Sequence, residues 1–233
     1  MTIRVHADGD VTHLILDRGG RRNAIDDVMV TALRDALSAC ASLCVVLSSA
    51  DPAAFCSGAD LRLDNGTRAR ISDELYGVYE QMRVYPGIVI AAADGPAVGA
   101  GAQLMLASDL RFASPRASLR FPGVGHGLTV GAWGLPGLVG RGRALELCLT
   151  MREVGADEAL RIGLVERVVS DPVADAVAFA QQLTTLDAAA VRRTKHVVGA
   201  VVDGLRMERA GNRATWDGSV TSPTRHPSTG NGM

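Results

Sequence analysis

Short strand-like runs alternate with single helical stretches over about the first two-thirds of the chain, and this order constrains the fold more than any other feature. Residues 2–8 and 11–17 alternate apolar and polar side chains about a Gly-Asp pair, which predicts a hairpin. LCVVLSS at 43–49 and GIVIAAADG at 87–95 predict short buried strands, with a helix expected from about Thr67 to Val84 between them. Such alternation is typical of an α/β fold.

The predicted helices also outline the organisation of the chain. A helix is expected over 25–37, with Asn23 as its N-cap. From Gly142 onward the sequence is largely helical, and the end of the chain is polar and rich in Gly, Pro and Ser, which predicts disorder. The predicted divisions are a core at 1–170, a helical C-terminal region at 171–220 and a disordered tail at 221–233.

Composition excludes several classes of protein. The 233 residues are 47% hydrophobic and 21% charged, as in a soluble globular protein, and the net charge of −1 provides no overall basic field for nucleic acid. No apolar run is long enough to span a bilayer, and the N-terminus lacks a signal peptide. The four cysteines form no CxxC pair or zinc pattern, so we expect no metal site and a cytoplasmic protein with reduced thiols.

Two glycine turns are the candidate functional motifs: FCSGADL at 55–61 and VGAGAQ at 98–103. Glycine allows unusual dihedrals and a close approach of the backbone to a ligand. The second turn opens a predicted helix, so amides near Ala100 are unpaired and lie at the positive end of its dipole. One amide from each turn could converge on a carbonyl oxygen and stabilise negative charge there. Tight packing alone would also explain either turn.

Neither turn matches a nucleotide-binding motif. Leu104 stands where a dinucleotide-binding GxGxxG motif requires its third glycine, and the chain contains no GK[ST] of a P-loop.

Taken together, three stretches resemble the crotonase superfamily, the enoyl-CoA hydratase/isomerase family, in order and spacing: LDRGGRRNAI, AFCSGADL and DGPAVGAGAQLMLASDLRFASPRASLRFPGVGHGL. The resemblance extends to about residue 200. It implies an α/β spiral of β-β-α units and a helical C-terminal region that builds homotrimers or hexamers as dimers of trimers. It also implies an acyl-CoA or enoyl-CoA thioester as ligand, within fatty acid metabolism. No cofactor would be permanently bound, because coenzyme A is part of the substrate or ligand.

The resemblance also implies roles for individual residues. The N–H groups of Ala59 and Ala100 would form the oxyanion hole for the thioester carbonyl. Cys56 would pack rather than react. Lys195, the only lysine, would lie near the CoA phosphates, although a solvated helix lysine is an equally good interpretation. The positions expected to line or support the CoA site are Arg22, Ala24, Ser57, Asp60, Leu61 and Lys195, with Asp60 fixing its loop.

The pattern departs from the family at both catalytic glutamates of its hydratases. Gln103 and Gly123 occupy those positions, and neither residue exchanges protons at neutral pH. A positioned acid or base contributes about 10²–10⁴ in rate, so hydratase activity is expected to be weak or absent while binding survives. The same departures resemble a subset of actinobacterial-type relatives that hold fatty acyl-CoA without hydrating it. Restoring both glutamates is expected to create activity.

Two alternatives remain open from the sequence. The chain could be an active lyase or isomerase of the superfamily (a hydratase, isomerase or decarboxylase) with a non-standard proton carrier such as His126, because histidine is a common general acid or base in enzymes. It could instead use the fold only as a trimeric scaffold. Trp133 replaces what is usually a glycine, and this aromatic ring would narrow the acyl tunnel or join the core.

Overall fold

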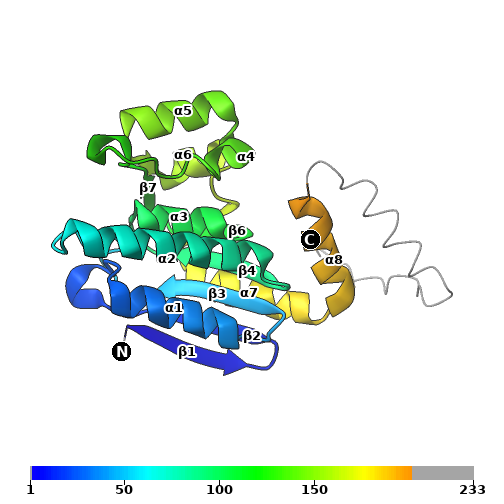
Figure 1. Cartoon of the computed structure of the whole chain (residues 1–233). Helices are drawn as coiled ribbons and strands as arrows, with labels where there is room; N and C mark the ends of the chain where they lie inside the picture. The colour runs from blue at the N-terminus through cyan, green and yellow to red at the C-terminus, as the bar shows by residue number, and fades with distance from the viewer. Residues whose placement is uncertain (1, 201–233) are drawn as a thin grey trace. The chain divides into compact units, whose positions relative to one another are not determined.

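The computed structural model describes residues 2–200 (Figure 1). The chain divides into two compact units, Met1–Arg192 and Arg193–Met233. The first unit contains the sheets and the helices described below. Of the second, the structure describes the last residues of helix α8 (Ala188–Gly199). The predicted tail at 221–233 lies outside the described residues.

A large sheet forms the centre of the first unit. Its six strands lie in the spatial order β1 (Ile3–Asp8), β2 (Val11–Leu16), β3 (Cys44–Ser49), β4 (Ile88–Ala93), β6 (Leu110–Ala113) and β9 (Arg167–Val168). The predicted hairpin is confirmed, because β1 and β2 pair antiparallel with Ile3 opposite Leu16. The other neighbours pair parallel. The sequence did not predict β9, since two residues are too few to show a period.

A smaller sheet carries the second glycine turn. Its strands are β5 (Ala97–Val98), β7 (Ser118–Arg120) and β8 (Val154–Gly155), with β7 between the other two. Strand β5 leads through Gly99 directly into helix α3 (Ala100–Ala107), all of whose residues are buried. The short sheet therefore fixes the place at which this helix begins.

Helices cover both faces of the large sheet. The helices α1 (Asp27–Ala39), α2 (Asn65–Val84) and α3 share a core with Leu14, Val45 and Leu47, and α7 (Pro172–Thr184) packs against Val46 and Phe112 on the other face. Successive side chains of a strand point to opposite faces, so the first four residues of β3, Cys44–Leu47, are all apolar and supply both cores. This arrangement explains the continuous apolar run LCVVL.

The remaining helical segments connect strands along the chain. They are η1 (Gly19–Arg21), η2 (Val124–His126), α4 (Leu135–Val139), α5 (Arg141–Thr150) and α6 (Ala156–Arg161). In the described residues no helix is both long and apolar enough to cross a membrane.

The predicted N-cap of α1 is wrong. Asp26, not Asn23, caps the helix, because its side chain accepts the Met29 N–H at 2.9 Å. Asn23 is fully buried in the left-handed region at φ 52°, and its amide donates to Ser49 Oγ at 2.7 Å and to the Phe55 carbonyl at 3.0 Å. Asparagine tolerates this backbone conformation better than most residues, and here its side chain braces two turns.

The Gly87→Ala substitution should destabilise the fold. A Cβ at Gly87 would lie 2.1 Å from the Leu43 carbonyl oxygen, a backbone atom that cannot rotate away. We expect the free energy of unfolding to fall by about 3 kcal/mol, the upper end for overpacking. Urea denaturation measures this change.

Gly77→Ala is the matched control. Gly77 lies exposed within α2 with nothing within 4 Å of an added Cβ, and alanine there should raise the free energy of unfolding by about 0.5–1 kcal/mol. Equal stability of the Gly87→Ala variant and the wild type would contradict the packing argument.

Candidate functional site

The two glycine turns are in direct backbone contact. The Val98 N–H donates to the Cys56 carbonyl at 2.9 Å, and Cys56 forms an isolated bridge with Ala97. An added Cβ at Gly58, whose φ is +97°, would lie 2.9 Å from the Val98 oxygen, and one at Gly101 would lie 2.3 Å from the Cys56 oxygen. Both positions therefore require glycine for the turns to approach this closely.

The amides of Ala59 and Ala100 are available at this junction. Hydrogen bonds from Ile25 N–H to the Gly58 carbonyl (2.8 Å) and from Asp60 N–H to the Ile25 carbonyl (2.9 Å) fix the backbone on both sides of Ala59. Ala100 is the first residue of α3, so its N–H has no acceptor within the helix. Among residues 2–200, neither amide donates a hydrogen bond. Two neighbouring N–H groups that have no acceptor within the protein can stabilise an oxygen that becomes negatively charged during a reaction.

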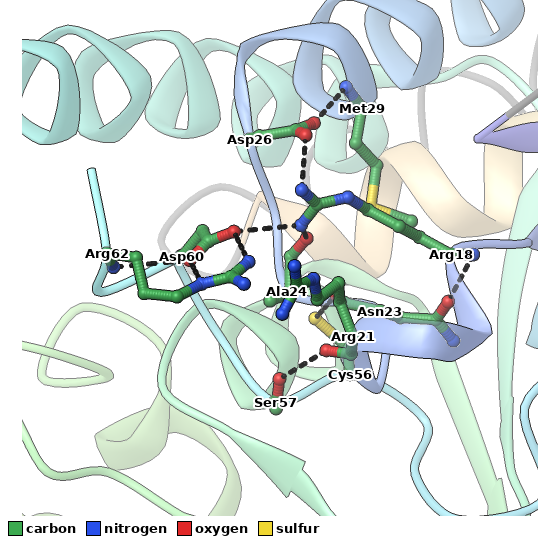
Figure 2. A network of polar contacts seen from close by, with 10 residues as sticks. All are labelled: Arg18, Arg21, Asn23, Ala24, Asp26, Met29, Cys56, Ser57, Asp60 and Arg62. Carbon is green, nitrogen blue, oxygen red and sulfur yellow. Dashed lines mark hydrogen bonds and ion pairs between the residues drawn. The ribbon is translucent and has the colours of Figure 1, made fainter.

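Asp60 is the centre of a polar network beneath the first turn (Figure 2). Its carboxylate, 4% exposed, accepts from Arg62 Nε at 2.9 Å and Nη2 at 2.5 Å and from Arg18 Nη1 at 3.1 Å. Arg18 also pairs with Asp26, the N-cap of α1, at 2.7 Å, and donates to the Ala24 carbonyl at 2.7 Å. The network thus joins the first turn to the segment that enters α1.

The same contacts determine the charge of Asp60. Hydrogen bonds from the Arg62 side chain hold the pKa of this carboxyl well below its usual range, even though burial acts in the opposite direction. Asp60 therefore remains ionised at neutral pH. A permanently ionised and fully paired carboxylate supports the loop and does not transfer protons.

The predicted CoA positions of the first turn lie together. Ser57 donates its N–H to the Arg22 carbonyl at 3.0 Å, which brings Arg22 and Ala24 beside the turn, and Leu61 is 61% exposed at its end. Lys195 lies on α8 in the second unit, so its role stays a prediction.

Cys56 is a packing residue, as expected. It is fully buried, its Sγ donates to the Asn23 carbonyl at 3.1 Å, and burial raises the pKa of the thiol to about 12. A thiol with that pKa is not a nucleophile at neutral pH. Within the described residues no group of three or more His, Cys, Asp or Glu is placed to hold a metal ion.

Gln103 lies buried on α3, and its surroundings were not predicted. Its Oε1 accepts the Trp133 indole N–H at 2.9 Å and the Gly131 N–H at 3.2 Å. The Trp133 ring stacks on Tyr79 with centroids 6.0 Å apart, and the Tyr79 hydroxyl donates to the Ala100 carbonyl at 3.3 Å. Burial raises the pKa of Tyr79 well above its usual value despite a hydrogen bond from Gln103, so the phenol stays protonated. These residues are far apart in the sequence, so the sequence alone does not predict that they contact one another.

Gly123 and His126 differ in their surroundings. Gly123 is buried, and a Cβ there would lie 2.7 Å from the Val130 nitrogen and 2.8 Å from the Leu128 oxygen, so the position has no room for a side chain. His126 is exposed on η2, where its own N–H donates to the Gly123 carbonyl at 2.9 Å. Its role as a proton carrier stays a prediction.

Comparisons with known proteins agree with this architecture. Residues 6–222 match the sequence profile of the family described as enoyl-CoA hydratase/isomerase. A Mycobacterium leprae protein named "Probable enoyl-CoA hydratase echA6" is 36% identical over 201 residues, which cover 82% of this chain and 80% of that protein.

Solved structures show the same fold. An enoyl-CoA hydratase from Bacillus anthracis is similar with a TM-score of 0.86 and 30% identity, over 91% of this chain and 90% of that one. A Thermobifida fusca protein assigned as an enoyl-CoA hydratase and solved in complex with CoA is similar with a TM-score of 0.82 and 33% identity, over 92% of each chain. The spiral of β-β-α units predicted from the sequence is confirmed.

Asp60→Asn should destabilise the protein in a pH-dependent way. The substitution removes the carboxylate that pairs with Arg62 and Arg18. Arg18 keeps Asp26 as a partner and Arg62 is half exposed to solvent, so we expect a loss of about 1–2 kcal/mol at neutral pH. The pKa of Asp60 is lower in the folded state than in the unfolded state. The stability that Asp60 contributes is therefore fully present above its unfolded pKa of about 3.9, and it is lost as the pH falls through its folded pKa. Denaturation from pH 7 to pH 2 measures the difference.

Asp73→Asn provides the control for this comparison. Asp73 is exposed on α2, and among residues 2–200 its carboxylate makes no hydrogen bond or ion pair, so little change is expected at any pH. A difference between the wild type and Asp60→Asn that stayed constant across the whole pH range would contradict the assigned pKa direction.

Proposed function

This chain belongs to the enoyl-CoA hydratase/isomerase family, and from that premise we propose that it binds fatty acyl-CoA thioesters and has weak or no hydratase activity toward 2-enoyl-CoA. One observation carries the proposal. The two turns present free amides at Ala59 and Ala100, while the neighbouring positions Gln103 and Gly123 provide no carboxylate.

The amides account for binding. In the proposal, the Ala59 and Ala100 N–H groups donate to the thioester carbonyl oxygen, and the positive end of the α3 dipole adds to the attraction. Since these donors belong to the backbone, their chemistry does not depend on which side chains occupy the site. The loss of both glutamates therefore leaves this part of the site intact.

The side chains account for the missing reaction. Hydration needs a group that takes a proton from water and a group that delivers one to the α-carbon. A neutral amide at Gln103 does neither, Gly123 has no side chain, and each missing group costs about 10²–10⁴ in rate. The paired Asp60 and the protonated Tyr79 are not substitutes, because neither changes its charge near neutral pH.

The remaining assignments concern the ligand and the assembly. Arg22, Ala24, Ser57 and Leu61 would line the CoA channel, and Lys195 would approach the CoA phosphates. The hydrogen bond from the Ser57 N–H to the Arg22 carbonyl and the CoA complex of the Thermobifida fusca relative support this part of the proposal. We further propose a homotrimer or hexamer in the cytoplasm, with CoA entering only as part of the ligand.

Titration calorimetry with a medium-chain 2-enoyl-CoA tests the proposal. We expect saturable heat that ends at one ligand per chain, with the injected thioester recovered unchanged by mass spectrometry. Injection of free CoA is the control, and it should bind more weakly because it lacks the acyl chain and its thioester carbonyl. Continuing heat and a hydrated product would show that the site is catalytic, and no binding at all would refute the thioester site.

Ala100→Pro should weaken thioester binding without unfolding the protein. Proline is tolerated at the first residue of a helix, but it removes the N–H proposed as an oxyanion donor. We expect Kd to rise at least about tenfold, which corresponds to one lost hydrogen bond. Calorimetry measures Kd, and circular dichroism checks the fold.

Ala188→Pro is the matched control. Ala188 is the first residue of α8 and follows Asp187, just as Pro172 follows Asp171 at the start of α7. This variant should bind thioesters as the wild type does. An Ala100→Pro variant with unchanged affinity would remove Ala100 from the proposed oxyanion hole.

A further inference from the structure

One loop, residues 128–133, lies beside both positions that lack a glutamate. Near Gly123, the Leu128 oxygen and the Val130 nitrogen lie where a side chain would begin. At Gln103, the Gly131 N–H and the Trp133 indole N–H both reach Oε1. The absence of the two carboxylates is therefore coupled to the path of a single loop.

The two contacts on Gln103 determine what its amide can offer. Both neighbours are hydrogen-bond donors, so the atom that faces them must be the oxygen, and the NH₂ group points elsewhere. A carbonyl oxygen has two lone pairs, and two donors use both of them. Gln103 consequently has no acceptor left to orient a water molecule.

The indole is held in place independently of Gln103. Its ring stacks on Tyr79 with an interplanar angle of 23°, and the Arg83 guanidinium lies 5.4 Å from the ring centroid. The hydroxyl of Tyr76 donates to the Thr129 carbonyl at 3.4 Å, which ties the start of the segment to the same helix, α2. Side chains of α2 therefore fix the donor that reaches Gln103.

We propose that Trp133 is a positioning residue whose indole N–H, together with the Gly131 N–H, occupies the Gln103 carbonyl oxygen and so excludes an ordered water from that side of the bound thioester. The inference rests on the proposed thioester site and adds to it a specific cause of protection from water. It also changes the expectation for restored glutamates. Glutamate does not fit at position 123, and at position 103 the carboxylate would still be engaged by Trp133.

NMR of the indole N–H groups tests the contact without any thioester. The chain has two tryptophans, Trp133 and Trp216, and Trp133→Phe identifies which resonance belongs to Trp133. Gln103→Glu should move that resonance downfield because a carboxylate is a stronger acceptor, and Gln103→Leu should move it upfield because the acceptor is lost. A Trp133 resonance that stays in place in both variants overturns the proposal.

Hydration of crotonyl-CoA tests the consequence. Phenylalanine keeps an aromatic ring beside Tyr79 but lacks the N–H, so Q103E/W133F frees a carboxylate oxygen that Q103E leaves engaged. We expect hydration by the double variant to exceed that by Q103E at least about tenfold, within the range of a positioned general base. Equal rates in two variants that both bind the thioester overturn the proposed role of Trp133.

The two proposals fail in different ways. If neither the wild type nor any variant binds an acyl-CoA in calorimetry, the proposed function is wrong, and the NMR result still decides whether Trp133 holds Gln103. If the thioesters bind but the Trp133 resonance does not respond at Gln103, the proposed function stands and the inference about Trp133 is wrong.

Discussion

The site depends on the close backbone contact between two turns that are about forty residues apart in the sequence. Gly58 and Gly101 lie at the contact, and a single Cβ at either position would meet a backbone oxygen of the other turn. The hydrogen bond from Val98 to Cys56 then fixes the register between the turns. Because the contact consists of backbone, it places the Ala59 and Ala100 amides near each other whatever side chains surround them.

Residues around the first turn hold this backbone contact in place. Arg22 and Asn23 adopt left-handed conformations, at φ 50° and 52°, and the Asn23 side chain holds Ser49 and Phe55. Asp60 links the turn through Arg18 to Asp26, which caps α1. The charged groups beneath the turn thus support the geometry of the backbone, and their ionisation is not free to serve in proton transfer.

The surroundings of Gln103 and Gly123 differ from those of the two amides. Where a hydratase needs carboxylates and a water molecule, this chain has a loop whose backbone fills the space at Gly123 and whose Gly131 and Trp133 saturate Gln103. Polarisation of a carbonyl and transfer of a proton are separate demands on a site. These contacts support the proposal that the protein holds a thioester and keeps water away from it.

The sequence by itself determined the α/β class, the hairpin and most helices, because apolar periodicity and turn residues act over short distances. It also located both glycine turns, since these are local motifs, while the resemblance to the family predicted the two positions without glutamates. Tertiary structure alone decided that Asn23 braces a turn while Asp26 caps α1, and that β9 joins the sheet. Tertiary structure alone brought Tyr79, Gln103 and Trp133 into one cluster. These residues are 24 to 54 positions apart, and contacts at that separation produce no periodic pattern in the sequence.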